Sequence, residues 1–220
     1  MNILLMGFST TGKSSILEEL KKEIGDSVKY IDSDSEISKN YNNHIFRLFI
    51  DKHTDEDPEN RKDIMDEISN GENSFLKNLT EFQDAYIAAL GPNVHIRSNW
   101  NEYYSKTKSY VIFLKADVDT VYQGLIRRED KLYPQFENNP AFGNWNQGVI
   151  RRYNPKTKLY ERLSENEAKR NISQLIDVNE NQYSKFANST FNANTLFKWH
   201  KDFDQNKKRG ILEIIKSKIS

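Results

Sequence analysis

The 220-residue sequence contains no cysteine, which excludes disulfides, thiolate catalysis and cysteine-ligated metal centres. It also has no apolar run of the roughly 20 residues that cross a bilayer, and no basic segment at its amino end typical of a targeting signal. We therefore expect a cytoplasmic protein that has no membrane partner.

Net charge is lacking too, because 32 lysine and arginine residues balance 32 aspartate and glutamate residues. Without a net positive field the chain has no general attraction for nucleic acid, and we expect none as a partner. The histidines show no spacing typical of zinc ligands. Hydrophobic residues make up only 36% of the sequence, so we expect one core and long polar loops.

Short apolar segments alternate with segments of helical periodicity along the chain. Apolar segments typical of buried parallel strands occupy residues 2–6, 28–31, 85–90, 110–114 and 189–193. Helical spacing occupies residues 14–24, 120–128, 163–186 and 207–219. This alternation predicts a single α/β domain over residues 1–220, with helices on both faces of a mainly parallel five-stranded sheet.

Two further regions are expected to complete this three-layer α/β/α domain. Residues 36–81 are mostly helical in pattern and are predicted to lie above the sheet, where they would bind an acceptor. Residues 129–148 are rich in asparagine, glycine, proline and aromatic residues, and we predict a loop there. We assign residues 127–152 to a lid that closes over the site.

The residues after the first predicted strand match the phosphate-binding pattern G-x-x-x-x-G-K-[ST] at every required position. The two glycines let successive backbone N–H groups face a phosphate at the amino end of the next helix. We expect Lys13 to reach the terminal phosphates and the Ser14 hydroxyl to bind Mg²⁺. The residues predicted to hold the nucleotide phosphates are Gly7, Ser9, Thr10, Thr11, Gly12, Lys13, Ser14 and Ser15.

Two aspartates, Asp32 and Asp34, follow the second predicted strand. The carboxyl ends of strands in open α/β sheets bind ligands, and alternation along an extended segment would turn both carboxylates to one side. We predict that Asp32 contacts Mg²⁺ and that Asp34 receives the proton of an acceptor hydroxyl. An Asx-rich turn that caps a helix is the alternative interpretation of the same residues.

The sequence lacks the motifs of two other classes of nucleotide-binding protein. Regulatory GTPases carry a D-x-x-G switch and an N-K-x-D base-recognition motif, and neither occurs here. ATP-driven motors carry an apolar strand that ends in acidic residues, which residues 111–117 match only loosely. A small-molecule kinase needs a carboxylate after the second strand, which this sequence has, and we predict an enzyme that uses Mg²⁺ and ATP.

These motifs, in this order, resemble those of shikimate kinases over about the first 165 residues. The resemblance begins with G-F-x-x-x-G-K-S at residues 7–14 and continues with the D-x-D of Asp32 and Asp34. A G-E-x-x-F segment then occurs at residues 71–75. The resemblance implies ATP as phosphoryl donor, Lys13 as a catalytic residue, and the two aspartates for metal organisation and acceptor binding.

The later motifs of the resemblance concern the acceptor and the lid. Gly91 follows the third strand, where the family has three glycines at the substrate. Arg127 and Arg128 end a helix after the fourth strand, where the family has basic residues at the nucleotide. Arg152 precedes a Leu-Tyr pair, as a later arginine of the family does. The resemblance therefore implies Arg128 at the nucleotide, Gly91 at the acceptor, and Arg152 at the acceptor and in catalysis.

The departures from the family fall on the acceptor side. The family has an arginine that grips the substrate carboxylate at the position of Leu76, and its glycine triplet is reduced here to Gly91. The lid carries an insertion around residues 136–145. Because loss of a charge-assisted bond costs roughly 1.5–3 kcal/mol, we expect the acceptor not to be shikimate. Arg97 is a candidate replacement for the missing arginine, although an exposed loop arginine is the commoner case.

Several alternatives stay open at the level of sequence. Arg127, Arg128, Arg151 and Arg152 are all candidates to contact the γ-phosphate. A nucleoside, nucleotide or polynucleotide 5′-hydroxyl kinase would share the same motifs, although zero net charge argues against a long nucleic-acid track. A nucleotide-dependent regulatory module without an acceptor is a third interpretation. We expect a monomer or a homodimer that binds nucleotide and a small-molecule acceptor.

Overall fold

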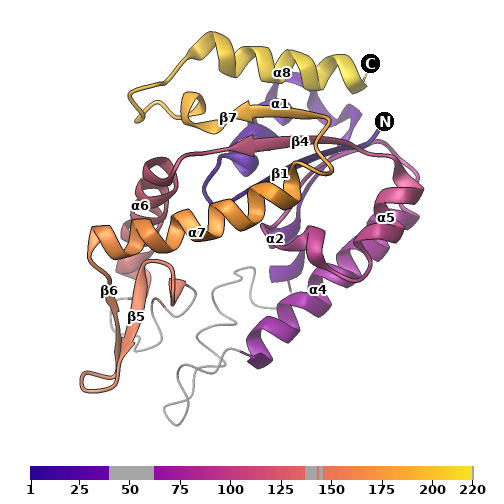
Figure 1. The fold of residues 1–220 in the computed structure, drawn as a ribbon. Coiled ribbons are helices and arrows are strands. Elements are labelled where there is room, and N and C mark those ends of the chain that lie inside the picture. Colours follow the sequence, from indigo (N-terminus) through magenta and orange to yellow (C-terminus); the bar gives the residue numbers. More distant parts are fainter. Residues whose placement is uncertain (40–61, 137–142, 144–145, 220) are drawn as a thin grey trace.

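The computed structural model describes residues 1–39, 62–136, 143 and 146–219. In this part of the chain a parallel sheet runs in the order β2-β3-β1-β4-β7 (Figure 1). Its strands are β1 (Ile3–Gly7), β2 (Lys29–Asp32), β3 (Tyr86–Ala89), β4 (Tyr110–Lys115) and β7 (Ser189–Asn192). The predicted α/β class and the five-stranded parallel sheet are confirmed.

Helices pack on both faces of this sheet. They are α1 (Lys13–Ile24), α2 (Ser33–Ser38), α4 (Lys62–Glu81), α5 (Trp100–Thr107), α6 (Val118–Phe136), α7 (Glu165–Tyr183) and α8 (Gln205–Ile219). Short 3-10 segments occur at η1 (Gly25–Ser27), η2 (Val94–Ile96) and η4 (Ala193–Leu196). No helix in the described ranges combines the length and the apolar character needed to cross a membrane.

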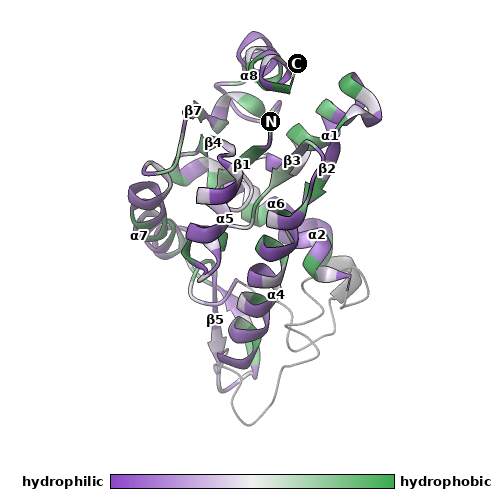
Figure 2. Cartoon of the chain, turned by 90° about the vertical axis from the view of Figure 1, so that its right-hand side faces the viewer, coloured by the Kyte–Doolittle hydropathy of each residue, from purple (hydrophilic) through white to green (hydrophobic). Residues whose placement is uncertain are grey.

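Alternation along the strands builds two apolar clusters, one on each face of the sheet. Ile3 and Leu5 of β1 pack with residues of α1 and α8, whereas Leu4 and Met6 pack with residues of α4 and α5. Figure 1 shows α1 and α8 on one side of the strands and α4 and α5 on the other. In Figure 2, β2 and β3 are largely hydrophobic, whereas α4 and α7 alternate between hydrophilic and hydrophobic residues. This is the layer arrangement that the sequence predicts.

The segment after β4 differs from the sequence prediction. We predicted a helix that ends at Arg128 and a loop from Glu129, but α6 continues to Phe136. An antiparallel hairpin of β5 (Arg151–Asn154) and β6 (Leu159–Arg162) follows and projects from the body of the molecule (Figure 1). The physical reason is a buried contact, because the Glu129 carboxylate binds Arg151 of β5 and so gives the extended helix a tertiary partner.

Some predictions fall on residues that the structure does not describe. Residues 40–61, within the region 36–81, and residues 137–142 and 144–145, within the lid insertion, lie outside the described residues. The described part of the region 36–81 consists of α2 and α4, so its helical character is confirmed there. The single-domain organisation stays a prediction.

The order of the strands determines where ligands can bind. β1 lies between β3 and β4, with Leu5 opposite Ala89 on one side and Ile112 on the other. The connection after β1 runs to β2 at one edge of the sheet, whereas the connection after β3 runs to β4 on the other side of β1, and such a reversal opens a crevice at the carboxyl ends of the strands. Both the phosphate-binding loop after β1 and the segment after β3 begin at this crevice.

Candidate active site

The phosphate-binding loop adopts a conformation that glycine makes accessible at its end. Gly12 has a φ of 87°, and Thr10 also has a positive φ of 67°. The Lys13 ammonium donates to the carbonyl oxygens of Gly7 and Phe8 at 2.8 and 2.9 Å, so the lysine lies over its own loop. Burial lowers the pKa of Lys13 to about 8, against the opposing effect of the nearby Asp34 and Asp32. An anionic ligand in the loop would therefore stabilise the charged form of Lys13.

A glycine in α6 lets this loop pack closely on the helix. A Cβ atom at Gly124 would lie 2.6 Å from Thr10 Oγ1, which is closer than such atoms approach in proteins. Thr10 Oγ1 lies 3.5 Å from the carbonyl oxygen of Val121 in the same helix. Sequence reasoning missed this residue, because a lone glycine in a helical pattern carries no signal of what it faces.

Ser14 and Asp32 are brought together at the mouth of the loop. The Ser14 hydroxyl donates to Asp32 Oδ2 at 2.6 Å, and Asp32 Oδ1 accepts the Ser35 amide at 3.2 Å. Asp32 therefore also caps α2, as the alternative interpretation predicted. A hydroxyl and a carboxylate are ligands that fit Mg²⁺, which takes few protein oxygens and completes its shell with phosphates and water. The described residues contain no group of three or more acidic, histidine or cysteine ligands.

Asp34 lies in the first turn of α2, not in an extended segment as we predicted. It still reaches the same cavity as Asp32, because the helix begins directly after β2 and turns its amino end toward the loop. Burial, and secondly the charge of Asp32, raise the pKa of Asp34, whereas the nearby Lys13 and Arg128 lower it. A half-buried carboxylate of raised pKa beside a phosphate site is suited to accept a proton.

These groups line one cavity of about 310 Å³. Its described lining comes from the phosphate-binding loop, the start of α2, residues 89–92, and Gly124, Arg127 and Arg128 of α6. The cavity also includes Phe197 and Trp199. The structure thus brings together the predicted residues Ser9, Thr10, Gly12, Lys13, Ser14, Ser15, Asp32, Asp34, Gly91 and Arg128.

Phe197 and Trp199 form an aromatic wall that sequence reasoning missed. Their rings stack with centroids 5.0 Å apart and planes at 21°. The Arg127 guanidinium lies 4.9 Å above the Trp199 ring, and a Cβ atom at Gly12 would contact the Phe197 ring at 3.2 Å. A signal was available in the sequence, since both aromatics follow the last strand at the ligand-binding edge of the sheet. The wall offers a flat surface beside the phosphate loop.

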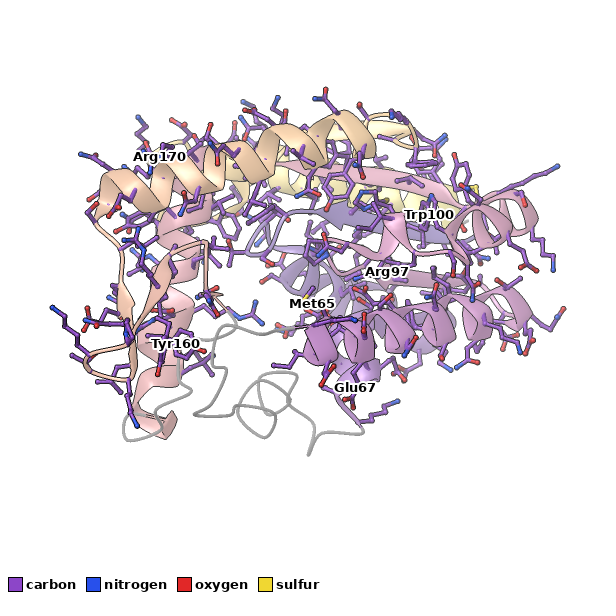
Figure 3. The ribbon with its side chains drawn as sticks, turned by 60° about the horizontal axis from the view of Figure 1, so that its bottom comes forward. Met65, Glu67, Arg97, Trp100, Tyr160 and Arg170 are labelled. Atoms are coloured by element: carbon purple, nitrogen blue, oxygen red, sulfur yellow. The ribbon has the colours of Figure 1, made fainter. Side chains whose placement is uncertain are left out.

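The segment after β3 closes the other end of the cavity. The Gly91 amide donates to Ser33 Oγ at 2.7 Å, which ties this segment to the start of α2. Glu72 of α4 is 4% exposed and lies against Gly91. Glu72 Oε2 accepts a hydrogen bond from Arg97 Nε, and Arg97 lies beside α4 (Figure 3). Leu76 is fully buried in the apolar cluster below α4.

The predicted site residues that are not among those lining this cavity are Gly7, Thr11, Arg97 and Arg152. Arg97 forms an ion pair with Glu72 and is not among the lining residues. Arg152 is exposed on β5, where it pairs with Glu167 at 3.1 Å. Of the lid arginines, Arg127 and Arg128 line the cavity and Arg152 does not. The roles of Arg97 and Arg152 stay predictions.

Arg151 points away from solvent into a charged cluster. Its Nε and Nη2 donate to the two carboxylate oxygens of Glu129 at 2.8 and 2.9 Å, and Glu129 is fully buried. Arg162 and Asn146 donate to the same carboxylate at 3.1 and 2.9 Å. Arg151 thus holds the hairpin on α6, which argues against the prediction that it is a candidate for the γ-phosphate.

Comparisons with known proteins agree with this geometry. A family model described as shikimate kinase matches residues 9–196. A search of curated proteins finds no match. Among solved structures, shikimate kinase from Bacteroides thetaiotaomicron is similar with a TM-score of 0.62 and 17% identity, over 100% of this chain and 98% of that one. Shikimate kinase from Acinetobacter baumannii, in complex with shikimate, gives 0.61 and 18% over 100% and 95%.

A nucleoside kinase also shares the fold. Deoxyadenosine kinase from M. mycoides with bound dATP has a TM-score of 0.53 and 12% identity, over 98% of this chain and 100% of that one. Identities this low support a common fold and nothing finer. The family match begins at residue 9, within the phosphate-binding loop, and runs through β2, β3, β4 and β7 to the end of η4.

Proposed function

The chain belongs to the shikimate kinase family, and we propose that it transfers the γ-phosphoryl group of ATP to a hydroxyl of a small polar molecule. The observation that carries this proposal is the shared cavity of Lys13 and Asp34. The acceptor oxygen attacks the γ-phosphorus as its proton passes to Asp34, and the bond between the β- and γ-phosphates breaks to release ADP. Lys13 stabilises the charge on the transferring group.

The nucleotide is proposed to bind between the phosphate-binding loop and the aromatic wall of Phe197 and Trp199. The base would stack beside Trp199, against which Arg127 already lies. Ser14 and Asp32 would hold Mg²⁺, because their oxygens meet at the mouth of the loop. The ion supplies neutralisation of phosphate charge when it is bound. Arg128, which lines the cavity near Asp34, is proposed to contact the phosphates.

The acceptor is proposed not to be shikimate. The resemblance implies a carboxylate-gripping arginine at position 76, where this chain has a leucine that is 0% exposed. Leu76 packs in an apolar cluster with Phe75, Leu79 and Trp100. A leucine there offers an acceptor carboxylate neither a charge nor a hydrogen-bond donor.

The test is replacement of Asp34 by asparagine. The expected result is a kcat that falls at least about a hundredfold, because a general base contributes roughly 10²–10⁴ in rate. ATP binding by calorimetry should persist, since the phosphate-binding loop is unchanged. The control Asp26→Asn changes an exposed aspartate in η1 and should leave kcat as it is. A regulatory module without an acceptor would show no turnover in the unaltered protein and no response to either change.

A further inference from the structure

The segment after β3 forms one wall of the cavity and packs directly on α2. Residues 89–92 are among the lining residues. The Gly91 amide donates to Ser33 Oγ at 2.7 Å, and Ser33 directly precedes Asp34. A Cβ atom at Gly91 would lie 3.2 Å from Asp34 Oδ1, so this wall is packed against the proposed general base. A shift of Gly91 and its neighbour Pro92 would therefore change the surroundings of Asp34.

A tyrosine at the end of α7 binds the same wall. The Tyr183 hydroxyl donates to the carbonyl oxygen of Pro92, which is a lining residue of the cavity. Tyr183 is only 1% exposed, and its ring packs on the Phe113 ring of β4 with centroids 5.1 Å apart. Burial, and secondly the charge of Glu72, raise the pKa of Tyr183, so its hydroxyl stays protonated and remains a donor.

A histidine three residues after Pro92 makes a second contact with α7. His95 is buried, and its Nε2 donates to Gln182 Oε1 at 2.6 Å. The His95 ring also packs on the Tyr183 ring, with centroids 4.5 Å apart and planes at 64°. Two neighbouring residues of α7 thus bind two points of one segment. None of His95, Gln182 and Tyr183 belongs to the motifs that carry the resemblance to shikimate kinases.

α7 is fixed in the core independently of the cavity. Ala168, Ile172 and Ile176 are buried in the apolar cluster that includes residues of α1 and α8. Tyr183, at the other end of the helix, belongs to the cluster on the opposite face of the sheet. The described lining of the cavity includes no residue of α7. A change of the Tyr183 hydroxyl would therefore reach the cavity through Pro92.

From these contacts we propose that Tyr183 is a positioning residue for phosphoryl transfer, which holds Gly91 and Pro92 in place against Asp34. The segment held in this way fixes where the acceptor hydroxyl lies relative to the carboxylate that takes its proton. This inference rests on the proposed kinase function and deepens it. The position matters because a displacement of about 1 Å between reacting groups can lower a rate about a hundredfold.

The first arm of the test compares two tyrosines that are equally buried. The full-length protein is assayed with Mg-ATP and a panel of cyclic polyols, sugars and ribonucleosides, and the compound of highest kcat/KM is kept. Tyr183→Phe should lower kcat at saturating acceptor at least about tenfold and leave the Kd of ATP as it is. The control Tyr103→Phe removes the hydroxyl of a fully buried tyrosine in the same cluster, which bonds to Tyr86 and Ser109. It should lower the melting temperature as Tyr183→Phe does, but should leave kcat unchanged.

The second arm measures amide hydrogen exchange and needs no acceptor. The amides of Gly91, Val94, Ile96 and Arg97 are all hydrogen-bonded. In Tyr183→Phe these amides should exchange at least about threefold faster than in the unaltered protein, and in Tyr103→Phe they should not. Unchanged exchange in Tyr183→Phe overturns this inference. Faster exchange with an unchanged kcat also overturns it, and leaves the kinase proposal standing. Absence of turnover by the unaltered protein on the whole panel overturns both.

Discussion

The same substitution at two adjacent arginines of β5 should affect two different properties, the stability of the protein at Arg151 and its activity at Arg152. Arg151 is 8% exposed and donates to both oxygens of the fully buried Glu129. Arg152 points to the other face of the strand, where its pair with Glu167 is largely in water. Replacing each by methionine removes the charge and keeps most of the length of the side chain. The comparison separates a structural contact from a catalytic one.

The size of the effect follows from burial. Loss of one partner from a buried ion pair costs about 3–5 kcal/mol, because the other charge is left without compensation. Arg162 and Asn146 still donate to Glu129 after Arg151→Met, so we expect the lower end, about 3 kcal/mol. For a domain of this size each kcal/mol moves the melting temperature by about 2–4 °C, which gives a fall of about 6–12 °C. Arg152→Met should leave the melting temperature unchanged.

Thermal melting by circular dichroism and kcat with an accepted substrate are the two measurements. If Arg152 closes on the γ-phosphate as proposed, Arg152→Met should lower kcat at least about a hundredfold without a change in melting. Adding Glu129→Gln to Arg151→Met should cost less than the sum of the single changes, since no unpaired buried charge remains. The reasoning is refuted if Arg151→Met melts like the unaltered protein, or if Arg152→Met lowers stability.

Three further results are expected. The affinity for ATP should fall about tenfold per pH unit above about pH 8. The pKa of Lys13 in the free protein is about 8, so above that pH the lysine must take up a proton when the nucleotide binds. An affinity measured by calorimetry that stays constant up to about pH 9.5 would contradict this. Trp199→Leu should weaken ATP binding about tenfold with little change in acceptor KM, and an unchanged Kd would exclude base stacking there. Gly124→Val should weaken ATP binding by displacing Thr10. The control Gly210→Val should not, because a Cβ atom at Gly210 would meet no atom within 4 Å. Equal affinities of the two variants in a nucleotide titration would show that the close packing of Thr10 on Gly124 is unimportant for ATP binding.

The position of the phosphate-binding loop at the cavity could be predicted because the residues that define the loop are contiguous in sequence. Residues 7–14 contain the loop, the lysine and the hydroxyl that we propose to bind Mg²⁺, and the flanking pattern places them between a strand and a helix. Asp32 and Asp34 needed one further step, the rule that ligands bind at the carboxyl ends of strands. This rule placed Asp32 and Asp34 at the cavity although Asp34 is helical, because α2 begins directly after β2.

The lid could not be predicted to the same degree. Whether the chain from Glu129 stays helical depends on Arg151, which is 22 residues away in sequence. Local composition there favours a loop, and a buried ion pair outweighs it. The same contact decides which of two neighbouring arginines faces inward, which no pattern in the short segment Arg151–Asn154 could reveal.

The acceptor end of the cavity shows why a shared order of motifs does not identify the acceptor of a kinase. Glu72 and Leu76 stand one helical turn apart on α4, so they belong to one face of the helix. With a leucine at 76, that turn joins the apolar core, and the charged contact lies one turn earlier, at Glu72 and Arg97. The arginine that the resemblance implies at an acceptor carboxylate is thus missing at position 76, whereas Glu72, which belongs to the G-E-x-x-F segment, pairs with Arg97. The contact between Glu72 and Gly91, which are 19 positions apart in sequence, is visible only in the structure.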